Sequence, residues 1–409
     1  MNVLIVGAQL ANKGAESMLY IATDEVKKRY PDAEVYFATI EEYEEDKYRF
    51  KKLYYSERAK IIALGGLSGW LEFGKALIWD AGKIVLGKHK HLGHYFDVKK
   101  AMPKIDMVID VSGFSVGTKW SKAAHISYIN NIRLAQKYNI PIYLMPQSFG
   151  PFDYSQEMQP IKEKLSVALK YPKVIYAREK NGYEELKKAF DLRNVRKSTD
   201  LVLQNRGIEL DNVFKEAPED KIPIVTEPKC VGIVPNIQCF NHGNKEKNMM
   251  IYNAVIKQLV DDGFKVIVFR HSREDLPICK EIKKNFIDCK AVALEEKEFS
   301  CLEYDEYVKQ FTFVVGSRFH GLVHAYRNNI PCVALGWAIK YQELADCVGQ
   351  SLYAFDITDT SCEIGDILKN LSEMENKHER ERLIIKNKMK EIQKDNCFDC
   401  ISERWFLNE

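Results

Sequence analysis

The chain has 409 residues, of which 46% are hydrophobic and 29% charged, and its formal net charge is +2. These values are typical of a globular protein of two or three domains, and the wide spread of lysine and arginine gives no indication of nucleic-acid binding. The ten cysteines show no disulfide framework, and the first ten residues are too short and too polar for a signal peptide. We therefore predict a cytoplasmic protein.

Short apolar runs alternate with helical patterns in the first half of the chain. The runs are nearly continuous, as in strands buried on both faces of a parallel sheet. Strands are expected at 2–8, 34–39, 59–65, 106–112, 140–146, 173–179 and 200–203. Helices are expected at 15–30, which Pro31 ends, and at 121–138, which Ser121 caps. The alternation predicts a Rossmann-like, doubly wound α/β domain over 1–205.

The stretch 61–87 is rich in apolar residues but is too interrupted to cross a bilayer. Glu72, Lys75, Asp80 and Lys83 leave no apolar span of about 20 residues. We favour an ordinary helix that covers a core over a helix that lies on a membrane, although its tryptophans and the following KHKH suit a membrane surface. The histidine-rich stretch 88–94 is interpreted as a basic surface loop, because no carboxylates or cysteines support a metal site.

A polar segment with three prolines, 206–229, is predicted to be a linker. Alternation then resumes, with strands expected at 230–236, 264–270, 290–295, 312–317 and 330–336 and helices at 246–262, 275–287, 303–310, 318–328 and 338–347. This predicts a second Rossmann-like domain over 230–362. A long charged helix opens a C-terminal segment, 363–409, that can cross back to the first domain. Cys397 and Cys400 lack partners for a zinc site and are interpreted as two thiols.

Two such domains place the carboxyl ends of their strands at a common cleft, which is the expected ligand site. Polar candidates at strand ends of the first domain are Asn12, Glu16, Gln147, Ser148 and Arg178. No G-x-G-x-x-G pattern is present, so dinucleotide binding is poorly supported. Each candidate has a structural alternative: a first-turn acid for Glu16, turn formation for Gln147 and Ser148, and a surface ion pair for Arg178.

The stretch FVVGSRFHGLVHAY, 313–326, carries the strongest site signal. An apolar strand stops at Gly316, and Ser317, Arg318 and His320 follow at the start of a helix. The Arg318 guanidinium can hold a carboxylate or phosphate at two points, and helix-start amides add to that field. A nearby cation lowers the pKa of His320 whereas a bound phosphate raises it, which suits an acid that protonates an anionic substrate. The alternative is a histidine that merely packs at the domain interface.

Several of these motifs together resemble the polysaccharide pyruvyltransferase family. The matching stretches, over roughly residues 1 to 350, are GAQLANKGAESML, MPQSFGPF, YAREKNGYEEL followed by STDLVL, and VVGSRFHGLVHAYRNNIPCVAL. The resemblance implies a fold similar to the two-domain GT-B glycosyltransferases. It also implies transfer of pyruvate from phosphoenolpyruvate to a pair of sugar hydroxyls, giving a ketal and inorganic phosphate.

Residue by residue, the resemblance implies that Arg318 and Arg178 hold phosphoenolpyruvate and that His320 is catalytic. It places Lys340 near a lysine often found after the next strand, and Asn12 at the asparagine of the first loop. Departures from the family pattern, KGAES in the first loop and DVSGFS after the fourth strand, lie in the domain expected to meet the acceptor. The acceptor's identity therefore stays open.

The chemistry of phosphoenolpyruvate fits these residues without a metal or a cofactor. We expect His320 to be the general acid, with Gln147, Ser148, Ser317 and Lys340 among the substrate contacts. Glu16 and Asp110 are candidates for the base, and the acceptor sugar can be lipid-linked, which allows at most peripheral membrane contact. One alternative is a nucleotide-sugar glycosyltransferase that uses Tyr341 and Glu343; another is a non-catalytic partner in polysaccharide assembly.

Overall fold

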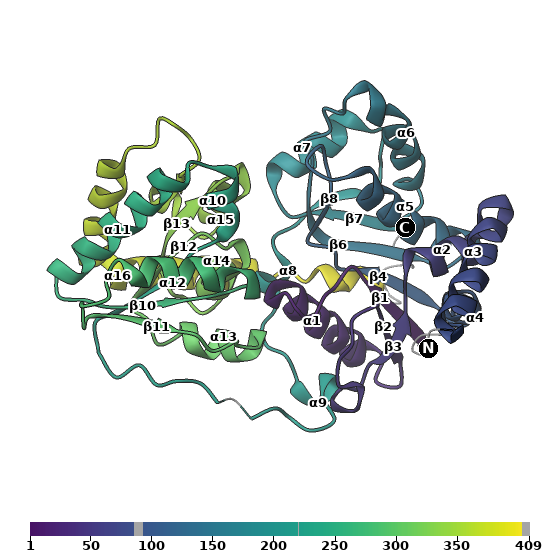
Figure 1. Ribbon diagram of the computed structural model, residues 1–409, viewed down its shortest axis with the longest axis horizontal. Coiled ribbons are helices and arrows are strands. Elements are labelled where there is room, and N and C mark those ends of the chain that lie inside the picture. Colours follow the sequence, from purple (N-terminus) through teal and green to yellow (C-terminus); the bar gives the residue numbers. More distant parts are fainter. Residues whose placement is uncertain (86–92, 220, 403–409) are drawn as a thin grey trace.

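The computed structural model describes residues 1–85, 93–219 and 221–402. Two α/β domains lie side by side, each around one sheet (Figure 1). The first sheet has the strand order β3-β2-β1-β4-β6-β7-β8, with β5 paired to β6, and the second has the order β11-β10-β9-β12-β13-β14. Neighbouring strands are parallel in both. The two doubly wound domains predicted from the sequence are confirmed.

The first domain follows the expected alternation of strands and helices. Its strands are β1 (Asn2–Val6), β2 (Glu34–Thr39), β3 (Lys51–Tyr54), β4 (Met107–Asp110), β5 (Phe114–Val116), β6 (Ile142–Phe149), β7 (Val174–Ala177) and β8 (Val195–Lys197). Its helices include α1 (Lys13–Arg29), α2 (Glu57–Leu64), α3 (Gly66–Val85), α4 (Asp97–Ala101), α5 (Lys122–Lys137), α6 (Gln159–Ala168), α7 (Lys180–Ala189) and α8 (Leu201–Gln204). The connecting segment that follows contains α9 (Leu210–Val213).

The second domain repeats the pattern. Its strands are β9 (Cys230–Val234), β10 (Lys265–Phe269), β11 (Val292–Glu295), β12 (Phe313–Gly316), β13 (Cys332–Gly336) and β14 (Ala354–Asp356). Its helices include α10 (Ile237–His242), α11 (Lys245–Asp261), α12 (Leu276–Lys284), α13 (Cys301–Val308), α14 (Phe319–Arg327), α15 (Ile339–Cys347) and α16 (Ile364–Ile392). The central strands β9, β12 and β13 are buried along their whole length, as their apolar runs predict.

Two stretches expected to be strands are helices. Of the stretch 59–65, residues 59–64 fall in α2, because the Ser56 hydroxyl accepts a hydrogen bond from the Ala59 amide and caps the helix. Of the stretch 200–203, residues 201–203 fall in α8, where the Asp200 carboxylate accepts from the Val202 amide and caps the helix in the same way. In both cases a capping side chain before a short apolar run indicates a helix start that apolar content alone misses. The short strands β3, β5, β8 and β14 were not predicted either.

Helix α1 joins the two domains (Figure 1). Its apolar residues, such as Met18 and Tyr20, belong to one continuous core cluster with Tyr304 and Phe319 of the second domain. Polar contacts cross at the same place, including the Lys13 ammonium, which donates to the His271 carbonyl at 2.6 Å. The interface between the domains is thus largely apolar and buried, with polar contacts at its edge.

The C-terminal segment touches both domains. Helix α16 packs on α11 of the second domain, and the 3₁₀ turn Cys397–Ile401 lies against β6 of the first. There the Tyr30 hydroxyl donates to the Ile401 carbonyl at 2.6 Å, and the Cys397 amide donates to Gln204 at 3.0 Å. Cys397 and Cys400 are buried, free thiols in this turn.

The 61–87 stretch forms the end of α2 and the whole of α3, but α3 differs from the expected core-covering helix. Only Gly69 and Ala76 of α3 are buried. None of the helices in the described parts of the chain is long and apolar enough to span a membrane. The histidine-rich stretch 88–94 lies mostly outside the described residues.

Candidate functional site

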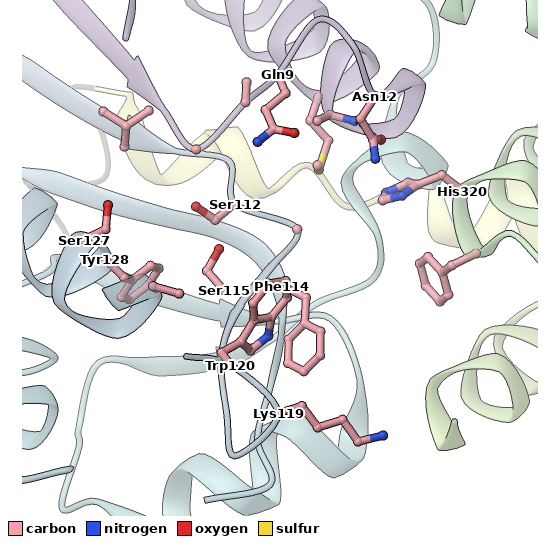
Figure 2. A pocket seen from close by; sticks show the side chains of 18 of the residues that line it. Gln9, Asn12, Ser112, Phe114, Ser115, Lys119, Trp120, Ser127, Tyr128 and His320 are labelled. Carbon is pink, nitrogen blue, oxygen red and sulfur yellow. Dashed lines mark hydrogen bonds between the residues drawn. The ribbon is translucent and has the colours of Figure 1, made fainter. Parts of the chain in front are cut away.

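A cavity of about 1300 Å³ lies between the two domains at the carboxyl ends of their strands. The loop after β1, the segment after β4 and the end of β7 line it from the first domain, and the starts of α14 and α15 line it from the second. Figure 2 shows Gln9 and Asn12 on one wall and His320 reaching in from the opposite domain. Its polar lining includes Gln9, Asn12, Lys60, Ser112, Lys119, Tyr128, Arg178, Gln238, Arg318, His320 and Lys340.

Arg318 lines the cavity, but its guanidinium is already held by two carboxylates. Its Nε and Nη2 donate to Asp275 at 2.7 and 2.6 Å, and Nη2 also donates to Glu274. Asp275 is fully buried, so the pair fixes the arginine at the start of α14. The sequence analysis placed Arg318 at this site. It did not predict that Asp275 and Glu274, 43 and 44 residues earlier, would neutralise the charge of its guanidinium.

Arg178 enters the cavity from the end of β7 and is likewise compensated. Its Nη1 donates to Asp200 at 2.9 Å, and its Nε donates to Glu179 and to the Ser148 hydroxyl, both at 2.9 Å. The guanidinium lies 4.4 Å from the ring centroid of Phe319, which comes from the other domain. This cation–π contact helps to hold Arg178 at the junction of the domains.

His320 lies close to Arg178, and its ring carries a buried nitrogen to which none of the described residues is hydrogen-bonded. Its Nε2 is buried, makes no hydrogen bond within the described residues, and lies 3.7 Å from Asp200 Oδ2. Burial lowers its pKa well below the usual value, and the charge of Arg178 adds to that effect. The free protein therefore holds a neutral imidazole at pH 7, which a bound anion can convert to an imidazolium.

Gly14 in the first turn of α1 makes room for this imidazole. A Cβ at position 14 would lie 2.2 Å from His320 Cγ, which no real contact allows. Asn12, two residues earlier, caps α1 by accepting hydrogen bonds from the Gly14 and Ala15 amides. The loop that the sequence indicated for ligand binding thus also fixes the position of the His320 ring.

Lys340 reaches the cavity from the first turn of α15. Its Nζ lies between 5.1 and 5.8 Å from the ring centroids of four aromatic residues, Phe114, Phe319, Trp337 and Tyr341. Burial first, and then the charge of Arg178, lower its pKa to about 8. Within the described chain, Lys340 forms no hydrogen bond or ion pair, so its ammonium is available to a ligand.

Three predicted substrate contacts lie behind the cavity lining instead. Gln147 is fully buried and accepts a hydrogen bond from the Tyr128 hydroxyl at 3.0 Å. Ser148 donates to Glu179 at 2.6 Å and orients Arg178. The Ser317 hydroxyl bonds with Tyr252 at 2.7 Å. The polar groups of these side chains are engaged in hydrogen bonds with neighbouring residues. They therefore position the residues that face the cavity and do not face it themselves.

Glu16 also lies away from the cavity and links the two domains. Its carboxylate accepts hydrogen bonds from the Cys301 amide and the Tyr20 hydroxyl, both at 2.8 Å. Burial raises its pKa. Both oxygens are occupied, and the first-turn acid interpretation describes this residue better than substrate contact.

We expect Glu16→Ala to destabilise the protein and to leave substrate binding unchanged. The variant removes the acceptor of the buried Cys301 amide, and leaving that donor unpaired costs about 1–3 kcal/mol. The Tyr20 hydroxyl loses the same acceptor but keeps its contact with the Tyr48 hydroxyl at 3.2 Å. Thermal unfolding measures the loss, and KM for the donor serves as the second readout. A stable variant with a raised KM would restore Glu16 to the substrate site.

Sequence reasoning missed the residue that connects this site. Asp200 pairs with Arg178, approaches His320 and caps α8, yet it begins the stretch 200–203 that apolar content assigned to a strand. The capping pattern of an aspartate before a short apolar run could have revealed it.

Asp110, a candidate base, is fully buried. It accepts a hydrogen bond from the Ser112 amide at 2.8 Å, and burial raises its pKa.

The fold and the cavity define a two-domain α/β protein with an interdomain, arginine- and lysine-lined ligand site. The model of the polysaccharide pyruvyl transferase family matches residues 12–338, well over half of the chain. The chain belongs to this family, as its motifs indicated. Comparison with curated proteins gives no match.

Solved structures with a similar fold include UDP-GlcNAc 2-epimerases. The Methanocaldococcus jannaschii enzyme is 11% identical with a TM-score of 0.52, covering 91% of this chain and 92% of its own. The S. aureus MnaA–UDP co-structure is 12% identical with a TM-score of 0.53, covering 94% and 90%. The Neisseria meningitidis enzyme is 12% identical with a TM-score of 0.52, covering 94% of each chain. These likenesses confirm the predicted GT-B-like arrangement of the two domains.

Proposed function

We propose that the protein transfers pyruvate from phosphoenolpyruvate to two hydroxyls of a sugar in a cell-surface polysaccharide or its precursor. The products are a pyruvate ketal and inorganic phosphate. The observation that carries the proposal is the meeting of Arg178, Arg318, His320 and Lys340 at one interdomain cavity in a chain of this family. The reaction needs no metal or cofactor, because the donor already carries an activated enol.

The donor subsite lies where the four basic residues meet. Both arginines already have carboxylate partners. The negative charge of the donor is therefore neutralised mainly by the Lys340 ammonium and by a proton taken up by His320. The arginines contribute directed N–H groups whose positions are fixed before the donor arrives. A trianion with a carboxylate and a phosphate close together fits this mixture of fixed and inducible positive charge.

The proposed reaction balances with one proton relayed through His320. The imidazolium donates its proton to the methylene carbon, and a sugar hydroxyl oxygen forms a bond to the neighbouring enol carbon. The proton of that hydroxyl returns to His320. The second hydroxyl forms the other C–O bond while the bond to the phosphate oxygen breaks, and phosphate leaves with that electron pair and the second proton. Arg178 and Lys340 stabilise the departing charge.

The acceptor subsite is the part of the cavity that the first domain lines apart from Arg178, and Lys60 and Lys119 lie there beside neutral groups. Gln9, Ser112, Ser115 and Ser127 supply neutral hydrogen-bonding groups there, as sugar hydroxyls require (Figure 2). Trp120 forms an aromatic wall beside them. Neutral polar groups next to an indole suit a sugar ring better than a second anion does.

A nucleotide-sugar glycosyltransferase is supported less well by the residues first considered for it. The Tyr341 hydroxyl donates to the Ser317 carbonyl at 2.8 Å and is buried. The Glu343 carboxylate accepts from the Asn181 amide at 2.9 Å. Both are engaged within the protein, and neither is a lining residue of the large cavity.

Thermal unfolding with phosphoenolpyruvate, beside a panel of UDP-sugars, tests the proposed donor. A ligand at 100 times its dissociation constant stabilises a protein by about 2.7 kcal/mol, which gives a measurable shift in Tm. We expect phosphoenolpyruvate to raise Tm and the UDP-sugars to leave it unchanged. If only a UDP-sugar stabilised the protein, the proposed pyruvyltransferase function would be wrong and a glycosyltransferase function would be favoured.

A further inference from the structure

Helix α3 exposes eight apolar side chains at the edge of the first domain. We call this set the α3 surface; it consists of Leu67, Trp70, Leu71, Leu77, Ile78, Trp79, Ile84 and Val85, which are between 47% and 85% exposed. Isolated exposed apolar residues are common, but eight on one 20-residue helix are not. Exposed apolar residues gathered in this way are typical of an interaction site.

The polarity of α3 is reversed relative to a helix that covers a core. Leu67, Leu71, Ile78 and Val85 follow spacings of four and seven residues and therefore share one face, which points away from the protein. The acids are turned away from that face and engaged: Glu72 pairs with Arg58 and Lys75, and Asp80 accepts a hydrogen bond from the Gly93 amide.

Lysines accompany the α3 surface along the sequence. Lys75 and Lys83 lie on the helix itself together with Glu72 and Asp80, and the sequence that follows it contains Lys88 and Lys90. The exposed Trp70 and Trp79 combine an apolar ring with a polar N–H, the combination that suits the boundary between water and lipid chains. Apolar residues, tryptophans and lysines together match the chemistry of an anionic lipid surface.

The position of α3 leaves this surface accessible. It lies at the end of the first domain farthest from the second domain (Figure 1). It follows directly on α2, whose Lys60 lines the sugar end of the cavity. A contact made through α3 would therefore leave the cleft open and set the first domain, with its part of the cavity, against whatever α3 binds.

We propose that α3 docks the protein on an anionic lipid bilayer, lying in the plane of the membrane with its apolar face inserted at the headgroup boundary. The helix carries four charged residues and does not span the bilayer. The proposal does not depend on the pyruvyltransferase reaction, since it rests on the α3 surface alone.

Flotation of the full chain with lipid vesicles tests this docking. Phosphatidylcholine vesicles that contain phosphatidylglycerol should carry the protein, and vesicles of phosphatidylcholine alone should carry much less. The variant Leu71→Glu/Ile78→Glu should lower binding to the anionic vesicles by at least about tenfold, because two charges enter the inserted face. The control Ile287→Glu/Leu352→Glu changes equally exposed apolar residues of the second domain and should bind like the wild type.

Two further measurements separate membrane docking from misfolding and from self-association. Thermal unfolding of both double variants should match the wild type, because all four positions are exposed; the milder Trp70→Ser/Trp79→Ser variant replaces Leu71→Glu/Ile78→Glu if that protein is unstable. Equal vesicle binding by a folded α3 variant overturns the proposal. So does sedimentation that shows a wild-type dimer and a monomeric α3 variant, since a second copy of the chain would then cover the surface.

Discussion

His320→Asn is expected to lower turnover by about 100-fold or more while phosphoenolpyruvate still binds. General acid catalysis contributes about 10²–10⁴ in rate, and asparagine cannot donate the proton to the methylene carbon. Asparagine is smaller than histidine and fits beside Gly14. Binding is measured by calorimetry and turnover by phosphate release. Retained turnover would rule out the acid role of His320.

Proton uptake on donor binding supplies an independent check on His320. Its pKa is well below the usual value in the free protein, and the bound anion raises it, so binding draws a proton onto the ring at pH values between the two pKa values. Donor affinity should then fall as pH rises through the pKa of the complex. Calorimetry in buffers of different ionisation enthalpy measures the uptake, and His320→Asn should abolish the protein's share. Identical uptake in the variant would mean that only the donor's phosphate titrates.

Lys340→Met is expected to weaken donor binding by about tenfold to 100-fold, because charge-assisted hydrogen bonds contribute about 1.5–3 kcal/mol. Lys340 belongs to the proposed donor subsite, and its ammonium has no ion-pair partner within the described chain. Methionine keeps most of the apolar stem among the surrounding rings, so the fold should be retained. The matched control is Lys119→Met, which removes a more exposed lysine of the same cavity. An equal loss in both variants would indicate a general field rather than a specific contact.

The pH dependence of donor binding tests whether the charged form of Lys340 contributes to donor affinity. Its pKa in the free protein is about 8, so the ammonium is present below that pH and is lost above it. Donor affinity should therefore fall as pH rises above about 8, and it should level off above the pKa of Lys340 in the complex, which the bound anion raises by stabilising the ammonium. The Lys340→Met variant should lack this limb and keep the one that belongs to His320. If donor affinity still fell above about pH 8 in the variant, that pH dependence would belong to another titratable group.

The sequence by itself determined the two-domain fold and the strand-end positions of the basic residues. Strands buried in a parallel sheet have continuous runs of apolar residues. The residue that follows such a run lies at the carboxyl edge of the sheet. This is why Arg178, after β7, and Arg318 and His320, after β12, could be placed at the cleft before the structure was known. The family motifs depend on the same local order along the chain.

Only the tertiary structure decided how these residues are paired and which way the surfaces face. Arg178 and Asp200 lie 22 residues apart, Arg318 and Asp275 lie 43 apart, and Glu16 reaches the Cys301 amide across 285 residues. No local pattern encodes such contacts, because they arise when separate elements pack together. The outward apolar face of α3 follows the same logic: periodicity shows that a helix has an apolar face, whereas the neighbours it meets decide whether that face is covered.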